Sequence, residues 1–442
     1  MKKSKLQFAF FIFVVCAFGV LLLTEAGADA ADVKEVKIGF VWPLTGGSAT
    51  IGQQHDDGAR MAIEEINANG GIKSLGGAKI VAVVTDSETK PDVGSSRVEQ
   101  LVTKDNVVIV SGCYNSAVTF PASEVAERYS TPFLSQGGVR DAITERGFKW
   151  VFRLNNKATY DVVEMIHGLD LIKKHFGHEV KTYALIYEST DWGADNARIW
   201  RQHADQRGWK CVLDEPVTVG QADMSSQIAK IKAANPDVIN ASFYTPEQIV
   251  FSRAMVINRV NPPLGVWSVG GGAQDPAFFA AVTPKEYEYM FVQEDWDCAG
   301  TLNYPWIAEL GKKIEAEKGY KINSFFAQGW TAAYVAYAAL EAAGSTDKEA
   351  IRKALVNMDI GKGDNRMNLS GYSRIKFDEQ GQNTFSSGTI IQYVKGVGVG
   401  FFPELNTFPG WEKELVIPIP NDFATRGNNS VEWGTLGKWE SK

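Results

Sequence analysis

The chain has 442 residues, 45% of them apolar and 22% charged, and its formal net charge at pH 7 is -7. This length predicts two or more domains with a sizeable core, and the composition is typical of a globular protein. The acidic balance argues against nucleic acid or an anionic membrane surface as a binding partner.

Residues 1–30 have the pattern of a secretory signal peptide. The basic segment Met1–Lys5 precedes the apolar run Leu6–Leu23, and Ala28-Asp29-Ala30 offers a cleavage site. The alternative is an uncleaved membrane anchor, because an apolar run of this length can just span a bilayer. We expect cleavage and export to the periplasm or beyond, which removes three lysines and two acids and leaves a net charge of -8.

From Val36 onward, short apolar strands alternate with amphipathic helices. The first expected strands are Val36–Trp42, Lys79–Thr85, Val107–Val110 and Pro132–Ser135. One helix has apolar residues at helical spacing and ends at Asn69-Gly70-Gly71, and another covers about Val93–Thr103.

A second series of strands and helices follows. The expected strands are Thr182–Tyr187, Lys210–Leu213, Val238–Tyr244, Leu264–Val269 and Tyr289–Glu294. The expected helices are Asn196–Gln206, Ser226–Ala234, Pro246–Asn258, Tyr304–Lys318 and Phe325–Ala343. Arg374–Phe377 and Gly388–Val394 are expected to pair as a hairpin around Asp378–Gln382, and the residues beyond Gly396 show little periodicity.

The fold class follows from this alternation. Strands that are rich in Val and Ile and separated by helices predict a parallel sheet covered on both faces. Two successive series of similar size predict two lobes, each an α/β doubly wound parallel sheet.

No catalytic signature is present in the sequence. It contains no G-x-S-x-G, H-E-x-x-H or G-x-x-x-x-G-K-[ST] motif, and its five histidines are not grouped as metal ligands would be. We therefore expect no catalytic residue, no metal and no cofactor, and a protein that is not an enzyme. Of the four cysteines, Cys16 lies in the expected signal peptide. The three that remain, Cys113, Cys211 and Cys298, are an odd number, and the sequence does not assign a pair among them.

The segment after Val107–Val110 is a candidate binding site, because doubly wound sheets bind ligands where strand ends meet helix N-termini. Pro121 suits the first turn of a helix, so the helix is expected to begin near Ser116 to Thr119 with unbonded backbone N–H groups. Asn115, Ser116 and the amide of Ala117 are therefore candidates to hold a carboxylate. The alternative is that Asn115 or Ser116 only caps the helix.

Three further features share this position at strand ends. Gln136 and Gly137 follow the fourth strand, where glycine lets the backbone approach a ligand closely. Trp192 is expected in a loop after Thr182–Tyr187, and Tyr244 is expected at the end of the strand Val238–Phe243. For each aromatic side chain the alternative is packing between the lobes.

Several segments, in this order and spacing, resemble the periplasmic solute-binding proteins of the leucine/isoleucine/valine class, which are receptor subunits of ABC importers. They lie between about Val36 and Val394 and include Pro43-Leu44-Thr45-Gly46, Gly58-Ala59, Asn69-Gly70-Gly71-Ile72, Thr119–Ser123 and Tyr244–Glu247. The resemblance implies the type I periplasmic-binding fold, with two lobes that are joined by three crossover strands and close over the ligand by a hinge.

The resemblance also implies where the lobes begin and end. Lobe 1 is expected at residues 31–153 plus 295–372, lobe 2 at 154–294 plus 373–395, and a tail, 396–442, is expected to pack on the lobes. The crossovers are expected near Arg153, near Gln293 and at residues 370–375.

By the same resemblance, Ser116 binds the ligand carboxylate and Gly137 adds backbone contacts. Trp192 and Tyr244 close from the second lobe, and Tyr160 and Gly270 line the cleft. The chain departs from amino-acid binders in having Val139 where they have a threonine, and no acid in the segment 269–271, where they have a glutamate for the ligand ammonium. Either Asp191, Asp275 or Glu294 substitutes for that acid, or the ligand has no amine.

The expected function is that of a monomeric receptor that captures a small carboxylate-bearing solute, such as a branched-chain or other hydrophobic amino acid, and docks on the permease subunits of an ABC importer. One alternative is an amine-free ligand such as an aromatic acid, an amide or urea. An alternative of a different class is a soluble ligand sensor or regulatory binding protein.

Overall fold

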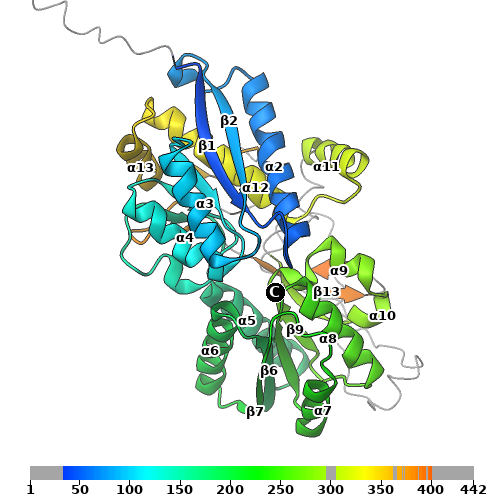
Figure 1. The fold of residues 1–442 in the computed structure, drawn as a ribbon. Helices are drawn as coiled ribbons and strands as arrows, with labels where there is room; N and C mark the ends of the chain where they lie inside the picture. The colour runs from blue at the N-terminus through cyan, green and yellow to red at the C-terminus, as the bar shows by residue number, and fades with distance from the viewer. Residues whose placement is uncertain are drawn as a thin grey trace, which may run out of the picture.

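The computed structural model describes residues 33–294, 305–361, 366–370, 372, 374–386, 388–394 and 397–400. The expected signal peptide, Cys298 and the chain from residue 401 onward lie outside the described residues. Figure 1 shows two α/β lobes, one with the labelled strands β1 and β2 and the other with β6, β7 and β9. The predicted fold class, two doubly wound α/β lobes, is confirmed.

The first lobe is built on a five-stranded sheet in which all neighbours are parallel, in the order β2-β1-β3-β4-β5. Its strands are β1 (Glu35–Trp42), β2 (Lys79–Asp86), β3 (Ile109–Gly112), β4 (Phe133–Ser135) and β5 (Val151–Arg153). Its helices are α2 (Ala49–Ala68), α3 (Pro91–Thr103), α4 (Ser116–Arg128), α11 (Pro305–Lys318), α12 (Ser324–Ala343) and α13 (Lys348–Val356).

Alternating side chains of β1 explain how this sheet is covered. Ile38, Phe40 and Trp42 pack in one core cluster with α2 and α12, whereas Val41 packs in another with α3 and α4. Helix α12 follows the second lobe in the chain and yet lies beside α2 in the first lobe (Figure 1). The chain therefore crosses between the lobes more than once.

The second lobe is built on a seven-stranded sheet in the order β14-β13-β10-β9-β8-β6-β7. Its strands are β6 (Thr182–Glu188), β7 (Lys210–Val217), β8 (Val238–Ser242), β9 (Val266–Val269), β10 (Phe291–Glu294), β13 (Thr389–Val394) and β14 (Val397–Gly400). Its helices are α5 (Ala158–Phe176), α6 (Asp191–Gln206), α7 (Ser225–Ala234), α8 (Thr245–Ile257), α9 (Pro276–Ala281) and α10 (Pro284–Tyr287).

Strand β6 shows the same division of faces. Tyr183 and Leu185 pack with α5 and α6, and Ala184 and Ile186 pack with α7 and α8. The pairs from β7 to β10 are parallel, but β13 runs antiparallel to both β10 and β14. Three short 3₁₀ helices, η1 (Lys73–Leu75), η2 (Asp141–Ile143) and η3 (Gly271–Ala273), complete the described helices.

The hairpin expected near the end of the described chain is wrong. β12 (Arg374–Ile375) pairs with β11 (Ile360–Gly361), whereas β13 pairs with β10 and β14. The turn itself is present as a bridge between Phe377 and Asn383. Turn residues specify a reversal, but the partner of each strand depends on which sheet edge lies nearby, and this is set by tertiary structure. Strand β14 was likewise not expected in the segment beyond Gly396.

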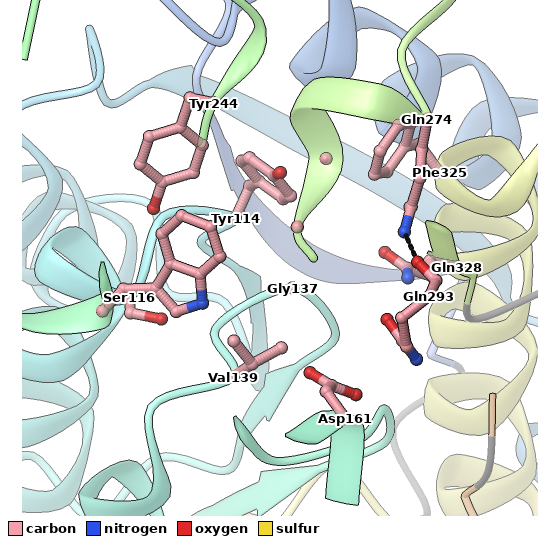
Figure 2. Close-up of a pocket in the computed structure, with 13 residues that line it drawn as sticks. Tyr114, Ser116, Gly137, Val139, Asp161, Tyr244, Gln274, Gln293, Phe325 and Gln328 are labelled. Atoms are coloured by element: carbon pink, nitrogen blue, oxygen red, sulfur yellow. Dashed lines mark hydrogen bonds between the residues drawn. The ribbon is translucent and has the colours of Figure 1, made fainter. Parts of the chain in front are cut away.

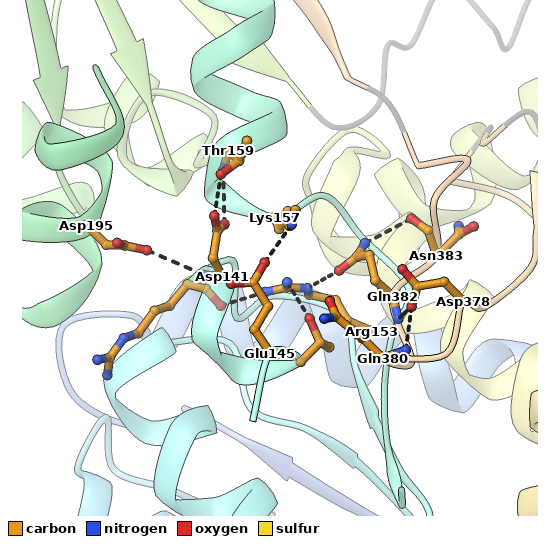
Figure 3. A network of polar contacts seen from close by, with 12 residues as sticks. Asp141, Glu145, Arg153, Lys157, Thr159, Asp195, Asp378, Gln380, Gln382 and Asn383 are labelled. Carbon is orange, nitrogen blue, oxygen red and sulfur yellow. Dashed lines mark hydrogen bonds and ion pairs between the residues drawn. The ribbon is translucent and has the colours of Figure 1, made fainter. Parts of the chain in front are cut away.

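Arg153, at the end of β5, is the centre of a buried polar network (Figure 3). Its Nη1 donates to the carbonyl oxygens of Gly138 (3.1 Å) and Arg140 (2.7 Å), its Nη2 to Thr144 Oγ1 (2.9 Å) and its Nε to Gln382 Oε1 (2.5 Å). Burial lowers the pKa of Arg153 to about 10, so the group stays charged at neutral pH. Neutral oxygen atoms thus hold a buried cation, as hydrogen bonding of buried charge requires.

The segment that lies along Arg153 is Gly381–Asn383. The backbone N–H of Arg153 donates to Gly381 O (2.7 Å), and that of Asn383 donates to Arg153 O (2.9 Å). The third crossover was expected at residues 370–375, but the structure places residues 374–375 in the β11–β12 pair instead. The network therefore joins the end of β5 to a part of the chain that follows every described helix of both lobes.

Candidate ligand-binding site

A cavity of about 30 Å³ lies where the carboxyl ends of strands from both sheets face each other. This volume is too small for a small-molecule ligand, so a solute can enter only if the residues around the cavity move. Its lining residues are Tyr114, Ser116, Gly137, Val139, Asp161, Trp192, Tyr244, Gly270, Gly271, Gln274, Gln293, Phe325 and Gln328. Figure 2 shows them, with Ser116 on one side and the three glutamines on the other.

Ser116 is the first residue of α4. Asn115 precedes it in extended conformation, and its carbonyl oxygen accepts from the N–H groups of Val118 (3.0 Å) and Thr119 (2.8 Å), which starts the helix. The hydroxyl oxygen of Ser116 accepts from the backbone N–H of Arg140 (3.2 Å), so its own proton can be donated to a ligand. The helix N-terminus adds partial positive charge, which favours an anion. Because α4 begins at Ser116, Pro121 falls in its second turn and not in the expected first turn.

At three other helices, α5, α6 and α9, acids of the chain itself accept from backbone N–H groups at the N-terminus. Glu188 accepts from the N–H groups of Thr190 and Gly193 at the start of α6, and Asp141 accepts from Thr159 N in α5. Asp275 accepts from Ala277 N in α9. At α4 the N-cap is the uncharged Asn115, whose side chain makes no cap hydrogen bond and donates instead to Ser48 Oγ (3.0 Å). This helix start is therefore suited to an anion from outside the chain.

The other side of the cavity carries oxygen-rich side chains. Asp161, in the first turn of α5, is 3% exposed. Gln293 donates through Nε2 to Glu164 Oε2 (3.2 Å), and Gln274 donates through Nε2 to Gln293 O (2.5 Å). No lysine, arginine or histidine is among the lining residues. This side therefore suits a cation or a group with N–H donors.

Aromatic rings lie between the start of α4 and the side of the cavity that carries Asp161 and the glutamines. The ring centroid of Trp192 is 5.0 Å from that of Tyr244, and Tyr114 is 5.7 Å from Phe325. Gly270 has φ +88°, and a Cβ there would lie 2.4 Å from the Trp192 ring, so glycine is needed beside the indole. Trp192 does not lie in the expected loop but in the first turn of α6. Because the Glu188 carboxylate caps this helix, α6 begins five residues before the expected Asn196.

Several contacts join the lobes around the cavity. Arg140 Nη1 pairs with Asp191 Oδ2 (2.6 Å), and the backbone N–H of Asp141 donates to Asp195 Oδ2 (3.4 Å). Burial raises the pKa of Tyr244, whereas hydrogen bonds from the Asn115 side chain and the Ser116 backbone oppose this shift. The Tyr244 hydroxyl of the second lobe thus lies against the start of α4 in the first.

The structure brings together five of the nine residues singled out from the sequence. Ser116, Gly137, Trp192, Tyr244 and Gly270 line the cavity. The other four do not line it: Asn115 bonds Ser48, Gln136 accepts from Ser111 Oγ (3.2 Å), Ala117 is the second residue of α4, and Tyr160 lies near Lys157. Val139, the noted departure, does line the cavity with an apolar side chain.

None of the three acids proposed to replace the missing glutamate lines the cavity. Asp191 pairs with Arg140, and Asp275 accepts from Thr245 Oγ1 (2.7 Å) and caps α9. The acid that lines the cavity is Asp161, one residue beyond Tyr160. In a helix, adjacent residues lie about 100° apart, so a shift of one position decides which side chain faces the ligand. Phe325 and Gln328 were also missed, although their spacing of three places them on one face of α12.

Metal and disulfide chemistry find no support in the described part of the chain. There, no group of three or more His, Cys, Asp and Glu side chains is placed to hold a metal ion. Cys113 and Cys211 are free thiols, and burial raises the pKa of Cys113. Among the described helices, none is both long and apolar enough to cross a membrane.

Two α/β lobes with a cavity between their strand ends define a two-lobed binding receptor of type I. The model of the periplasmic binding protein family matches residues 35–396, and the chain belongs to this family. Family membership makes the protein a solute-binding receptor and implies export from the cytoplasm.

The chain is similar to known proteins over most of its length. "Leu/Ile/Val-binding protein homolog 7" of Brucella abortus (strain 2308) is 29% identical over 393 residues, which are 86% of this chain and 94% of the relative. The substrate-binding protein LivJ of a branched-chain amino acid transporter from Streptococcus pneumoniae, solved with isoleucine, is 20% identical with a TM-score of 0.70 and covers 83% of this chain and 98% of its own. A solute-binding protein of an ABC transporter from R. palustris, solved with benzoate, is 18% identical with a TM-score of 0.69 and covers 83% and 95%. These two structures share the fold.

Proposed function

We propose that this protein is the receptor of an ABC importer for a hydrophobic α-amino acid. The observation that carries the proposal is the pairing of an acid-free helix N-terminus at Ser116 with the buried carboxylate of Asp161 in a cavity that lacks basic side chains. A zwitterion places a carboxylate at the first and an ammonium at the second, and its side chain meets the aromatic rings between them. The names of the relatives from Brucella abortus and Streptococcus pneumoniae support an amino acid of the branched-chain class.

Calorimetric titration of the purified mature protein tests this function. The panel is L-leucine, L-isoleucine, L-valine and L-phenylalanine, with benzoate as the amine-free comparison. We expect the amino acids to bind more tightly than benzoate, since only they have an ammonium for Asp161. Binding of benzoate alone would refute the amino-acid proposal and would leave the receptor function in place.

Ser116→Ala is expected to weaken the ligand by about 1–3 kcal/mol, or roughly 5- to 150-fold, because it removes a donor to a buried carboxylate. The measurement is the dissociation constant by calorimetry. Ser95→Ala is a matched control, because Ser95 is half-buried on α3, away from the cavity, and its hydroxyl donates to Pro91 O within that helix. An unchanged dissociation constant in Ser116→Ala would exclude the assigned role of this serine.

A second candidate ligand is an aromatic acid without an amine. Four aromatic side chains line the cavity, and the R. palustris protein of the same fold was solved with benzoate. Trp192→Ala is expected to weaken an aromatic ligand more than an aliphatic one, because only the former stacks on the indole. The measurement compares L-phenylalanine with L-valine in the wild type and the variant. Equal losses would count against stacking.

Hinge closure couples binding to transport in this proposal. In the closed receptor the two lobes have a fixed relative orientation. The permease subunits of an importer bind this ligand-bound conformation. The receptor works as an exported monomer, binds the solute without changing it and is therefore not an enzyme.

A further inference from the structure

Trp192, in the first turn of α6, lines the cavity and has an indole N–H group without an acceptor. The side chain is 2% exposed, and its Nε1 makes no hydrogen bond to the part of the chain that the structure describes. An indole N–H only donates, and in buried tryptophans it usually finds an acceptor. A ligand group that accepts from this N–H would therefore satisfy a donor that burial otherwise leaves unpaired.

Other deeply buried tryptophans give a basis for comparison. The indole groups of Trp267 and Trp330 donate to backbone carbonyl oxygens at 2.8 and 2.6 Å. Trp42 and Trp200 also lack an acceptor among the described residues, but both pack inside the core of a lobe and neither lines the cavity. Of these five indoles, Trp192 is thus the one whose unpaired N–H belongs to a cavity residue.

The neighbours of this indole place it at the anion end of the cavity. Its ring centroid is 5.0 Å from that of Tyr244, whose hydroxyl lies against the start of α4. Val139 packs against the same core cluster as Trp192, and the next residue, Arg140, donates its backbone N–H to Ser116 Oγ (3.2 Å). Figure 2 shows Tyr244 and Ser116 on one side of the cavity. The indole therefore lies at the end that carries Ser116.

We propose that the indole N–H of Trp192 donates to the ligand carboxylate, so that Ser116 of the first lobe and Trp192 of the second lobe bind the same group. The inference rests on the proposed function of the cavity and deepens it. A carboxylate accepts from several donors at once, whereas an ammonium offers no acceptor to an N–H group. A hydrogen bond to a charged acceptor is also about twice as strong as one between neutral groups.

A donor in this position links the carboxylate to the closed arrangement of the lobes. Ser116 and Trp192 belong to different lobes, so both can reach one carboxylate only when the strand ends of the two sheets face each other. The residue before Trp192, Asp191, pairs with Arg140 of the first lobe (2.6 Å), which holds the start of α6 beside that of α4. The residues around the cavity must move to admit a ligand, and closure then brings the indole to the carboxylate.

Replacement of Trp192 by benzothienylalanine tests the donor directly. In this amino acid, sulfur takes the place of the N–H group in a ring system of nearly the same size and shape. We expect the dissociation constant for L-leucine, measured by calorimetry, to rise about tenfold or more, because a hydrogen bond to a charged group is lost. An indole that only packs would tolerate the sulfur, so an unchanged affinity would overturn the inference.

Trp200 provides the matched control. It is a buried tryptophan of the same helix, α6, and its N–H also has no acceptor in the described part of the chain. The same replacement at Trp200 is expected to leave the affinity for L-leucine unchanged, and thermal unfolding shows whether both proteins are folded. An equal loss of affinity at both positions would mean that the effect does not come from the cavity, and would refute the inference.

Proton–nitrogen NMR of the indole groups gives an independent readout on the wild-type side chain. The replaced protein identifies the Trp192 signal by its absence. On addition of L-leucine we expect a downfield shift of this N–H proton, because a new hydrogen bond forms, and no comparable shift for Trp200. A Trp192 signal that does not shift in the L-leucine complex would contradict the assigned role.

The proposed function and this inference can fail separately. A wild-type protein that binds L-leucine with an affinity independent of the Trp192 N–H would refute the inference alone. If benzoate is the ligand, it replaces L-leucine as the probe, because it offers the same carboxylate. A wild-type protein that binds neither compound would refute the proposed function, and the inference that rests on it.

Discussion

Asp161→Asn is expected to weaken L-leucine by more than a hundredfold, corresponding to about 3 kcal/mol or more. The variant removes the charge that offsets a buried ammonium, and an unpaired buried charge is costly. Asparagine has almost the same size, so the cavity keeps its shape. The measurement is calorimetric titration of L-leucine and 4-methylpentanoate. We expect the amine-free probe to bind as well as it does to the wild type, or better.

Asp170→Asn is the matched control for this experiment. Asp170 lies on the same helix, α5, and pairs on the surface with Arg207 (2.6 Å). Loss of an exposed ion pair costs at most about 1 kcal/mol of stability and does not reach the cavity. Thermal unfolding of both variants separates folding from binding. Retention of L-leucine affinity in Asp161→Asn would exclude Asp161 as the ammonium partner.

Gly329→Ala is expected to lower the free energy of unfolding by about 3 kcal/mol and to weaken ligand binding as well. A Cβ at Gly329 would lie 2.0 Å from the carbonyl oxygen of His55, and one at Gly58 would lie 2.1 Å from that of Phe326. The two glycines thus let α2 and α12 cross in backbone contact. Because the neighbouring atoms belong to helix backbone, the helices must move apart, as in other overpacked cores.

Chemical unfolding measures the stability, and calorimetry measures the ligand affinity. Gly311→Ala is the control, since its Cβ would have its nearest contact at 3.4 Å from the Ile322 side chain. In that helix, α11, alanine should be neutral or slightly stabilising because it favours helix. If Gly329→Ala were as stable as Gly311→Ala, close helix crossing would not be needed for the packing of α2 against α12.

The order of strands and helices could be predicted from the sequence, because apolar residues recur at a different spacing in strands and in helices. The apolar run before Ser111 and the amphipathic segment after Asn115 predicted β3 and α4 close to their observed bounds. Strand β7 was expected to end at Leu213 and extends to Val217, because Asp214 and Glu215 on this edge strand break the apolar run. The pattern of apolar residues thus predicts the bounds of buried strands well and those of an edge strand poorly.

The site was partly predictable for the same reason. Ser116, Gly137 and Tyr244 lie at strand ends, which topology alone marks as the place for a ligand. Asp161 and Gln328 lie on helices whose neighbours in space are far away in sequence, and no local pattern shows which face of those helices meets the cavity.

The network around Arg153 has a consequence for how such receptors diversify. The guanidinium donates to backbone oxygen atoms of Gly138 and Arg140 and to side-chain oxygens of Thr144 and Gln382, and neither of these side chains lines the cavity. Val139 lies between Gly138 and Arg140, and its side chain takes no part in these hydrogen bonds. It can therefore change with the ligand. Substitutions of cavity side chains can therefore change the specificity without disturbing the polar network around Arg153.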